Sequence, residues 1–594
     1  MGAHAPTEGR RLPLRSTAPA IAWGLALFAS VVSVVLRQAV PFTVGGGAVD
    51  DKLYLRTATY LAEGAWLGPF DQYTLVKGPA YPAFIAAMYR AGIPLQTGEQ
   101  LTHLVAAAAV ALCVWTVLRR QVVALAAYVV LALDPTNFDT WASRATRDTW
   151  YASLTMLLLA LVFLAVYAAV SRARLRWIVA YSLLAGVAGG AFVLCREEPM
   201  WIAPALCVVV VGLPVAVMLR WWFRKPRARP EARASLVAAA RLLLAVGVIL
   251  GLAFASSVAV SDENQHQYGA AVTSDLVYGS FGRMYADWRR VDGGVSSPAD
   301  PITSAQRQAV YEVSPSARQL EPFLDPEGGC KSPTDAGFGF GSGIAPCRFP
   351  VWRGIRAAAT DLGYFETGAD AQRFFGQLDA EIESGCASGQ LRCSPRLPTS
   401  MQSLQLFQLH PFAAFMRTWT WRTALSSGYF DLPPGHRSRI GTVELRATLD
   451  RILRGVPTTV PQAAARDAAF GTRTWPYRLL FSVYRPLLPA LLLASVVGMC
   501  LPIVRPRWPQ AALSVLSLAF GLGALTRIAF VALLTITAFR TGGLEVRYLL
   551  PAHTLLLAFA VVGTCQLVDA ISARIAKRRG RASSTDAVAE AVMT

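Results

Sequence analysis

The chain has 594 residues, of which 54% are hydrophobic and only 16% are charged. Globular domains carry about 25% charged residues, so this composition excludes an ordinary soluble protein. The formal net charge of +19 does not indicate a nucleic-acid partner, because the arginines cluster in short segments between long apolar runs. This distribution is the positive-inside pattern of membrane proteins, in which lysine and arginine mark the cytoplasmic loops.

Ten apolar runs approach or reach the length that crosses the roughly 30 Å hydrocarbon core of a bilayer. They cover residues 17–40, 102–118, 121–134, 150–170, 177–195, 200–219, 237–259, 482–503, 510–538 and 549–570. Every loop that this topology places in the cytoplasm is rich in arginine. The run 121–134 is short. Arg527 falls within the run 510–538, where it either splits the segment or faces a polar cavity.

The predicted fold class is an all-α polytopic membrane protein of about ten transmembrane helices with a large mixed extracytoplasmic region. Its parts are an N-terminus 1–16, a membrane block 17–260 with a first outer loop 41–101, an extracytoplasmic region 261–478, a second membrane block 479–572 and a tail 573–594. We expect both termini in the cytoplasm and the polar tail to be disordered. The preference for arginine over lysine favours a bacterial source, so the predicted location is the bacterial inner (plasma) membrane.

Four of the nine cysteines fall in the predicted extracytoplasmic region. An oxidising compartment favours disulfides there. The simplest pairing by sequence distance joins Cys330 to Cys347 and Cys386 to Cys393.

Five polar clusters all fall on the predicted outer side. They are Asp50-Asp51-Lys52, the segment from Lys77 to Pro82 with Tyr81, the segment from Arg144 to Tyr151 with Arg147 and Asp148, Arg196-Glu197-Glu198, and the segment from Glu545 to Tyr548 with Arg547. Their common side predicts one outward-facing polar cavity. A transporter more often carries its polar residues at mid-bilayer, and only Arg527 is placed there.

The adjacent Asp50 and Asp51 have two interpretations. One aspartate caps a helix beginning near Lys52, where the helix dipole favours a carboxylate. Alternatively, one aspartate is a general base that takes the proton of an attacking hydroxyl, and its neighbour orients it or helps to hold a divalent cation, Mg²⁺ or Mn²⁺. A single cap does not explain two carboxylates.

The other clusters have similarly open interpretations. Lys77 is either an interfacial lysine or a phosphate ligand held by a Gly-Pro turn. On a helix, Arg144, Arg147, Asp148 and Tyr151 would share one face, so Asp148 is expected to pair with Arg144. Arg196 is expected to pair with Glu197 or Glu198, because carboxylates at a membrane border need partners. Arg547 and Tyr548 are either interface anchors or site residues.

The order of these motifs resembles the GT-C class of membrane glycosyltransferases. An acidic pair follows the first helix, then a helix with Tyr54, Tyr60 and Gly64, a K-x-P-x-Y-P-like segment, an R-x-x-R-D segment and a final R-Y-L-L-P. The arrangement is similar to dolichyl-phosphate-mannose protein mannosyltransferases and the lipid A aminoarabinose transferase. It covers residues 17–200 and 480–570, and the region 261–478 matches no known pattern.

The resemblance implies transfer of a sugar from a polyprenyl-phosphate donor, on the extracytoplasmic face, to a hydroxyl of an envelope glycan, lipid or protein, usually with inversion. Asp50 or Asp51 would be the base, and the Asp-Asp pair, where the class often has Asp-Glu, leaves open which. Lys77, Arg147 and Arg547 would stabilise the leaving phosphate, and Glu197 or Glu198 would hold sugar hydroxyls. The remaining substrate-binding candidates are Lys52, Tyr81, Arg144, Asp148 and Tyr548.

Two other functions fit part of the pattern. A polysaccharide ligase or polymerase shares the many helices and the large outer loop, but it is expected to rely on arginine and histidine in that loop. A flippase or transporter of lipid-linked sugars is not an enzyme, and it would not need the Asp pair for turnover.

Overall fold

The fold was examined in a computed structural model, which describes residues 17–40, 50–171, 173–222, 232–294, 301–325, 351–395, 409–431, 465, 468–504, 508–537 and 545–593. All regular elements in these ranges are helices, apart from one isolated bridge between Val291 and Cys393. The described residues of the region 261–478 form helices joined by loops.

Nine helical segments among the described residues are long and apolar enough to cross a membrane. They lie in α1 (Thr17–Ala39), α4 (Leu95–Leu118), α6 (Arg147–Val170), α7 (Leu175–Cys195), α8 (Ala203–Trp222), α9 (Ala232–Tyr268), α19 (Trp475–Val504), α20 (Trp508–Thr537) and α21 (Glu545–Met593). The predicted run 121–134 forms only the short apolar helix α5 (Gln121–Ala132). Arg527 does not split α20, which is continuous through it.

The bundle is built around α6. In the most apolar 18-residue stretch of this helix 83% of the residues are buried, a larger share than in the other candidate spans among the described residues. It packs against α4, α7, α8, α9 and α21. Leu, Val, Ala and Phe side chains cover all sides of α6, as expected for a helix with helical neighbours all round. The first residues of α6 are thereby buried inside the bundle, including Arg147 and Asp148.

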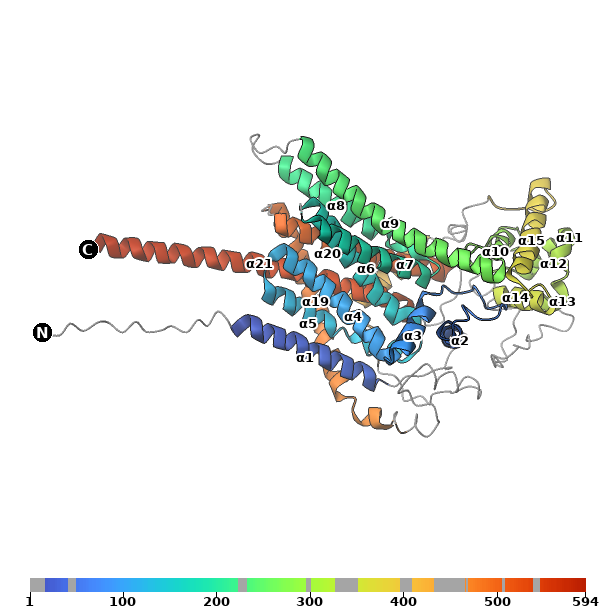
Figure 1. Cartoon of the computed structure of the whole chain (residues 1–594), viewed down its shortest axis with the longest axis horizontal. Coiled ribbons are helices and arrows are strands. Elements are labelled where there is room, and N and C mark those ends of the chain that lie inside the picture. Colours follow the sequence, from blue (N-terminus) through green and yellow to red (C-terminus); the bar gives the residue numbers. More distant parts are fainter. Residues whose placement is uncertain are drawn as a thin grey trace.

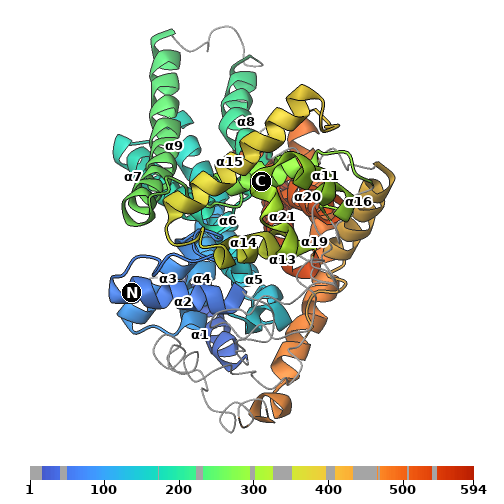
Figure 2. The ribbon, with the colours of Figure 1, turned by 90° about the vertical axis from the view of Figure 1, so that its right-hand side faces the viewer.

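The helices run side by side along the long axis of the molecule (Figure 1). The start of α1 and the C-terminal part of α21 lie at one end, and a helical lobe lies at the other. Between the bundle and this lobe are the short helices α2 (Asp50–Glu63) and α3 (Ala80–Ala91). Figure 2 looks onto the lobe end, with α2 and α3 beside the lobe.

In the described residues, the lobe comprises six helices. They are α10 (Ser280–Arg289), α11 (Ser304–Val313), α12 (Pro315–Arg318), α13 (Glu321–Leu324), α14 (Val351–Asp361) and α15 (Gly368–Ser388). It has its own hydrophobic core around Trp288, Phe281 and Phe375. The predicted helical pattern of Phe374, Leu378 and Ile382 is present in α15, where all three side chains are buried. Thr367 caps this helix at its start, and Gly389 ends it in the left-handed conformation.

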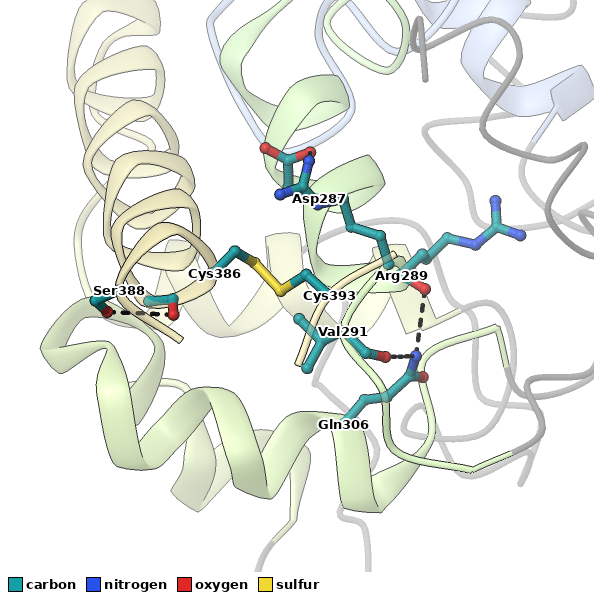
Figure 3. The surroundings of a disulfide bond; sticks show 9 residues. Asp287, Arg289, Val291, Gln306, Cys386, Ser388 and Cys393 are labelled. Atoms are coloured by element: carbon teal, nitrogen blue, oxygen red, sulfur yellow. Dashed lines mark hydrogen bonds and ion pairs between the residues drawn. A yellow bond between two sulfur atoms is a disulfide. The ribbon is translucent and has the colours of Figure 1, made fainter. Parts of the chain in front are cut away.

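A disulfide joins Cys386, near the end of α15, to Cys393, as the spacing predicts (Figure 3). It fixes the end of α15 next to the strand-like segment at Val291, which is bridged to Cys393. The other two cysteines of the prediction, Cys330 and Cys347, lie outside the described residues.

Two boundaries differ from the sequence analysis. The helix α9 continues to Tyr268, beyond the predicted end of its span at 259. The helix α21 continues to Met593, so residues 573–593 are helical where disorder was predicted.

The aromatic helix α16 (Leu409–Ala424) packs against α20 through a side that includes the buried Trp419, while Trp421 is exposed.

Candidate active site

The acidic pair forms the first turn of α2, where the helix dipole favours carboxylates. The two side chains differ in exposure: Asp51 is fully buried, whereas 22% of the Asp50 side chain is exposed. Arg144 holds both oxygens of Asp51, donating from Nη2 to Oδ1 at 2.5 Å and from Nε to Oδ2 at 3.3 Å. The third residue of the cluster, Lys52, lies in the same turn.

Asp50 lies between two cations from distant parts of the chain. Lys77 Nζ is 3.9 Å from its Oδ1, and Arg547 Nη2 donates to its Oδ2 at 3.1 Å. Partial burial acts to raise the pKa of Asp50, but the charges of Lys77, Arg547 and Arg147 outweigh it and lower that pKa below the ordinary value. For Asp51 the balance is opposite: burial raises its pKa although Arg144 is paired with it.

Asp148 at the start of α6 is the second centre of the cluster. It accepts from Arg547 Nε on Oδ2 at 2.5 Å and from Arg196 Nη1 on Oδ1 at 2.7 Å. Arg196 continues to Glu198, whose Oε1 it reaches at 2.9 Å, and the guanidinium of Arg527 lies 4.0 Å from the same oxygen. One continuous chain of charges thus connects α2, α6, α20, α21 and the turn after α7.

Arg147, the first residue of α6, holds Glu197 through two parallel hydrogen bonds of 2.9 and 2.7 Å and also donates to the carbonyl of Cys195. Burial would raise the pKa of Glu197, but the charges of Arg147 and Lys77 lower it to about 2. The carboxylate is therefore ionised at any physiological pH. Arg147 lies 5.8 Å from the centre of the Tyr54 ring on α2.

The described cluster contains more positive than negative groups. Its six cations are Lys77, Arg144, Arg147, Arg196, Arg527 and Arg547, and its five carboxylates are Asp50, Asp51, Asp148, Glu197 and Glu198. The net charge of one positive unit in a largely buried setting favours an anionic ligand.

Tyr81 and Tyr548, both predicted to bind substrate, lie in different surroundings. Tyr548 lies in the cluster, with its ring 5.3 Å from the guanidinium of Arg196 and 5.7 Å from that of Arg547. Tyr81 does not: it is fully buried and donates to Glu99 Oε1 at 2.6 Å. Its ring lies against those of Tyr54 on α2 and Trp150 on α6, and its role in substrate binding stays a prediction.

The predicted helical pair between Arg144 and Asp148 is wrong. The helix α6 begins only at Arg147, and Arg144 ends the short 3₁₀ turn η3 (Thr140–Ser143) in an extended conformation. Arg144 therefore points to Asp51 on α2, and Asp148 finds two other arginines.

Two contributors were underestimated from the sequence. Arg196 was assigned only as a partner of a neighbouring glutamate, yet it also holds Asp148. Arg527 is fully buried among the rings of Tyr151, Trp201 and Phe530, and its Nε donates to the carbonyl of Tyr548. Its charge within an apolar span was the signal that indicated a polar surrounding.

The aspartates that could hold a divalent cation are paired with cationic side chains. Within the described ranges, no group of three or more His, Cys, Asp or Glu side chains is arranged to hold a metal. Asp51 faces Arg144, and Asp50 faces Lys77 and Arg547. This donor set does not fit Mg²⁺ or Mn²⁺, which need several oxygen ligands.

Two solved structures are similar to the chain. The archaeal oligosaccharyltransferase AglB from Archaeoglobus fulgidus, in complex with an inhibitory peptide and a dolichol-phosphate, is 13% identical with a TM-score of 0.36, over 95% of this chain and 52% of that chain. ArnT from Cupriavidus metallidurans, bound to undecaprenyl phosphate, is 13% identical with a TM-score of 0.27, over 92% of this chain and 77% of that chain. The chain spans about half the length of AglB.

The two likenesses are to the GT-C class of membrane glycosyltransferases that the sequence motifs resemble. No protein-family model and no curated protein sequence matches the chain. Both TM-scores lie below 0.5.

Proposed function

We propose that the protein transfers a sugar from a polyprenyl-phosphate-linked donor to a hydroxyl group of an envelope glycan, lipid or protein on the extracytoplasmic side of the bacterial plasma membrane. The observation that carries this proposal is the position of Asp50. It is a partly exposed carboxylate, placed between Lys77 and Arg547 in a cluster with excess positive charge. A base beside a phosphate-binding pair of cations is the arrangement that such a transfer needs.

The proposed reaction is a single displacement. The acceptor oxygen attacks the anomeric carbon, its proton passes to Asp50, and the bond from that carbon to the phosphate oxygen breaks. Polyprenyl phosphate leaves with the bonding electron pair, and the configuration at the anomeric carbon inverts. Lys77 and Arg547 face the negative charge that develops on the phosphate, and preorganised groups of this kind contribute about 3–4 kcal/mol each.

Asp50 is favoured over Asp51 as the base by geometry. Both oxygens of Asp51 are held by Arg144 and the side chain is fully buried, so a substrate hydroxyl has no access to it. We assign Asp51 the role of fixing Arg144. Because both aspartates lie in the first turn of α2, Asp51 also fixes the orientation of Asp50.

A carboxylate with a low pKa is a weak base, but binding of the donor is expected to raise the pKa of Asp50. The lowered pKa of Asp50 arises from Lys77, Arg547 and Arg147, which overcome the effect of burial. A phosphate bound to Lys77 and Arg547 offsets their charges, so the pKa of Asp50 rises in the complex. The base therefore becomes effective when the donor is in place.

The other side chains of the cluster are assigned supporting roles. Glu197 and Glu198, at the turn after α7, are the proposed acceptors for sugar hydroxyls, and Arg147 and Arg196 hold them in place. Tyr278, in the turn before α10, is half exposed, and its pKa is raised by burial and by the charges of Glu197 and Glu198. We assign its aromatic ring the role of packing on a sugar. The reaction is proposed without a metal ion.

The test is a donor panel. Purified protein in liposomes is given polyprenyl-monophosphate sugars, polyprenyl-diphosphate sugars and nucleotide sugars with membrane extract as acceptor. The expected result is sugar transfer to the acceptor with release of polyprenyl phosphate from at least one monophosphate donor, and no sugar transfer from nucleotide sugars. Movement of the intact donor across the vesicle membrane without cleavage would instead support the flippase function and contradict the proposal.

A further inference from the structure

The segment 72–76, directly before Lys77, is held by the helical lobe. Arg356 on α14 donates from Nε to the carbonyl of Gln72 at 2.7 Å and from Nη2 to that of Thr74 at 3.4 Å. The backbone N–H of Asp275 donates to the carbonyl of Leu75 at 2.8 Å. These three hydrogen bonds connect α14 and the turn before α10 to a loop about 200–280 residues earlier in the sequence.

Arg356 is built into the lobe as a fixed group. Its side chain is 1% exposed, its Nη1 donates to Asp275 Oδ2 at 2.5 Å, and its guanidinium lies 5.0 and 4.8 Å from the ring centres of Phe281 and Phe365. Gln372 on α15 donates to the other oxygen of Asp275 at 2.5 Å. A buried ion pair is tolerated only when its polar atoms are satisfied in this way, and such a pair defines one geometry.

The loop itself needs this support. Leu75 has φ of +63°, a left-handed conformation that is strained for a residue with a side chain. On the other side, Gly78 touches α7: a Cβ at this position would lie 2.0 Å from the carbonyl oxygen of Leu194. Lys77 is therefore fixed between the lobe and α7, with its Nζ 3.9 Å from Asp50.

We propose that Arg356 is a positioning residue of the active site, which holds Lys77 against Asp50 through the segment 72–76. The inference rests on the proposed function, because it assigns the lobe a role in placing the phosphate-binding lysine. The lobe is then a part of the donor site, and changes in its contacts with the loop alter donor binding without any lobe residue contacting the donor phosphate.

The test is a double-mutant cycle on the binding of undecaprenyl phosphate to the full-length protein in detergent micelles. Lys77→Met is expected to weaken binding on the order of 10-fold, and Arg356→Gln to weaken it to a similar degree. If Arg356 acts through Lys77, adding Arg356→Gln to Lys77→Met changes the Kd by less than about 2-fold. An equal loss in both backgrounds would mean that Arg356 acts independently of Lys77 and would overturn the proposal.

Three further variants separate positioning from folding. Arg356→Lys keeps the charge beside Asp275 but has no planar fork to reach both carbonyls, so an intermediate Kd is expected. Arg373→Gln changes a 75% exposed arginine of the same lobe and is expected to leave the Kd unchanged. Arg307→Gln breaks the lobe's ion pair with Asp325. If it weakens binding as much as Arg356→Gln does, lobe stability explains the effect and the proposal is wrong.

The outcomes also separate this inference from the proposed function. If the wild type binds no undecaprenyl phosphate, or if Lys77→Met binds it normally, the phosphate site proposed at Lys77 is wrong and the inference falls with it. If Lys77→Met weakens binding but the cycle is additive, only the role of Arg356 is wrong.

Discussion

Replacing Arg547 with glutamine tests the phosphate-binding role of the cluster. Arg547 is the single side chain that contacts both Asp50 and Asp148 in the described cluster, and its removal lowers the net charge of that cluster from plus one to zero. Losing one preorganised cation at the leaving group is expected to lower kcat by about 10²–10³-fold, which corresponds to roughly 2.7–4 kcal/mol. The assay is release of polyprenyl phosphate at saturating donor.

Arg547→Gln is also expected to destabilise the fold, so Arg196→Gln serves as a matched control. Arg547→Gln leaves Asp148 with Arg196 as its remaining charged partner, so a stability loss near the low end of the roughly 3–5 kcal/mol range is expected. Arg196→Gln removes the other partner of Asp148 without touching Asp50. It is expected to lose similar stability but to keep more turnover. The reasoning is refuted if the two folded variants lose turnover equally.

Three further results are expected. For pH dependence, the lowered pKa of Asp50 means that this base stays ionised in the free enzyme, so kcat/KM is expected to stay flat as the pH falls to the ordinary carboxylate pKa of about 4. The value of kcat is expected to decline at a higher pH, because donor binding raises that pKa. An acid limb of kcat/KM above the ordinary carboxylate range would instead fit Asp51, whose pKa is raised. Gly78→Ala forces a Cβ against a carbonyl of α7 and displaces the adjacent lysine, so donor KM is expected to rise on the order of 10-fold, and an unchanged KM would contradict the tight packing. Cys393→Ser opens a short disulfide loop and is expected to destabilise the lobe by about 2–3 kcal/mol, measured as faster proteolysis within the lobe; unchanged proteolysis would show that the bond is not needed there.

The sequence was sufficient to predict the fold class and to indicate several of the charged residues that the structure brings together. Apolar length and arginine distribution predict a multi-span helical protein, because the bilayer imposes both patterns on the sequence itself. Charged residues next to spans, such as Asp50 and Arg547, can be recognised for the same reason, since a charge at a membrane border needs a partner or a ligand.

The pairing of these residues could not be predicted. The spacing of Arg144 and Asp148 suggested a helical pair, but the helix begins between them and their partners come from α2, α21 and the turn after α7. Tyr81 was assigned to the site from its motif alone, and only the tertiary structure shows that it is buried and donates to Glu99. The contact of Arg356 with Gln72 joins positions 284 residues apart, and no local pattern encodes such a contact.

The most direct test of the central claim compares turnover and donor binding in Asp50→Asn and Asp51→Asn. Sugar transfer is measured with the donor that the wild type uses, and binding with the same donor. If Asp50 is the base, Asp50→Asn lowers kcat by about 10²–10⁴-fold while donor affinity is retained or increased, and Asp51→Asn retains more activity. Wild-type turnover in Asp50→Asn would contradict the account, and the pair would then serve only the start of α2.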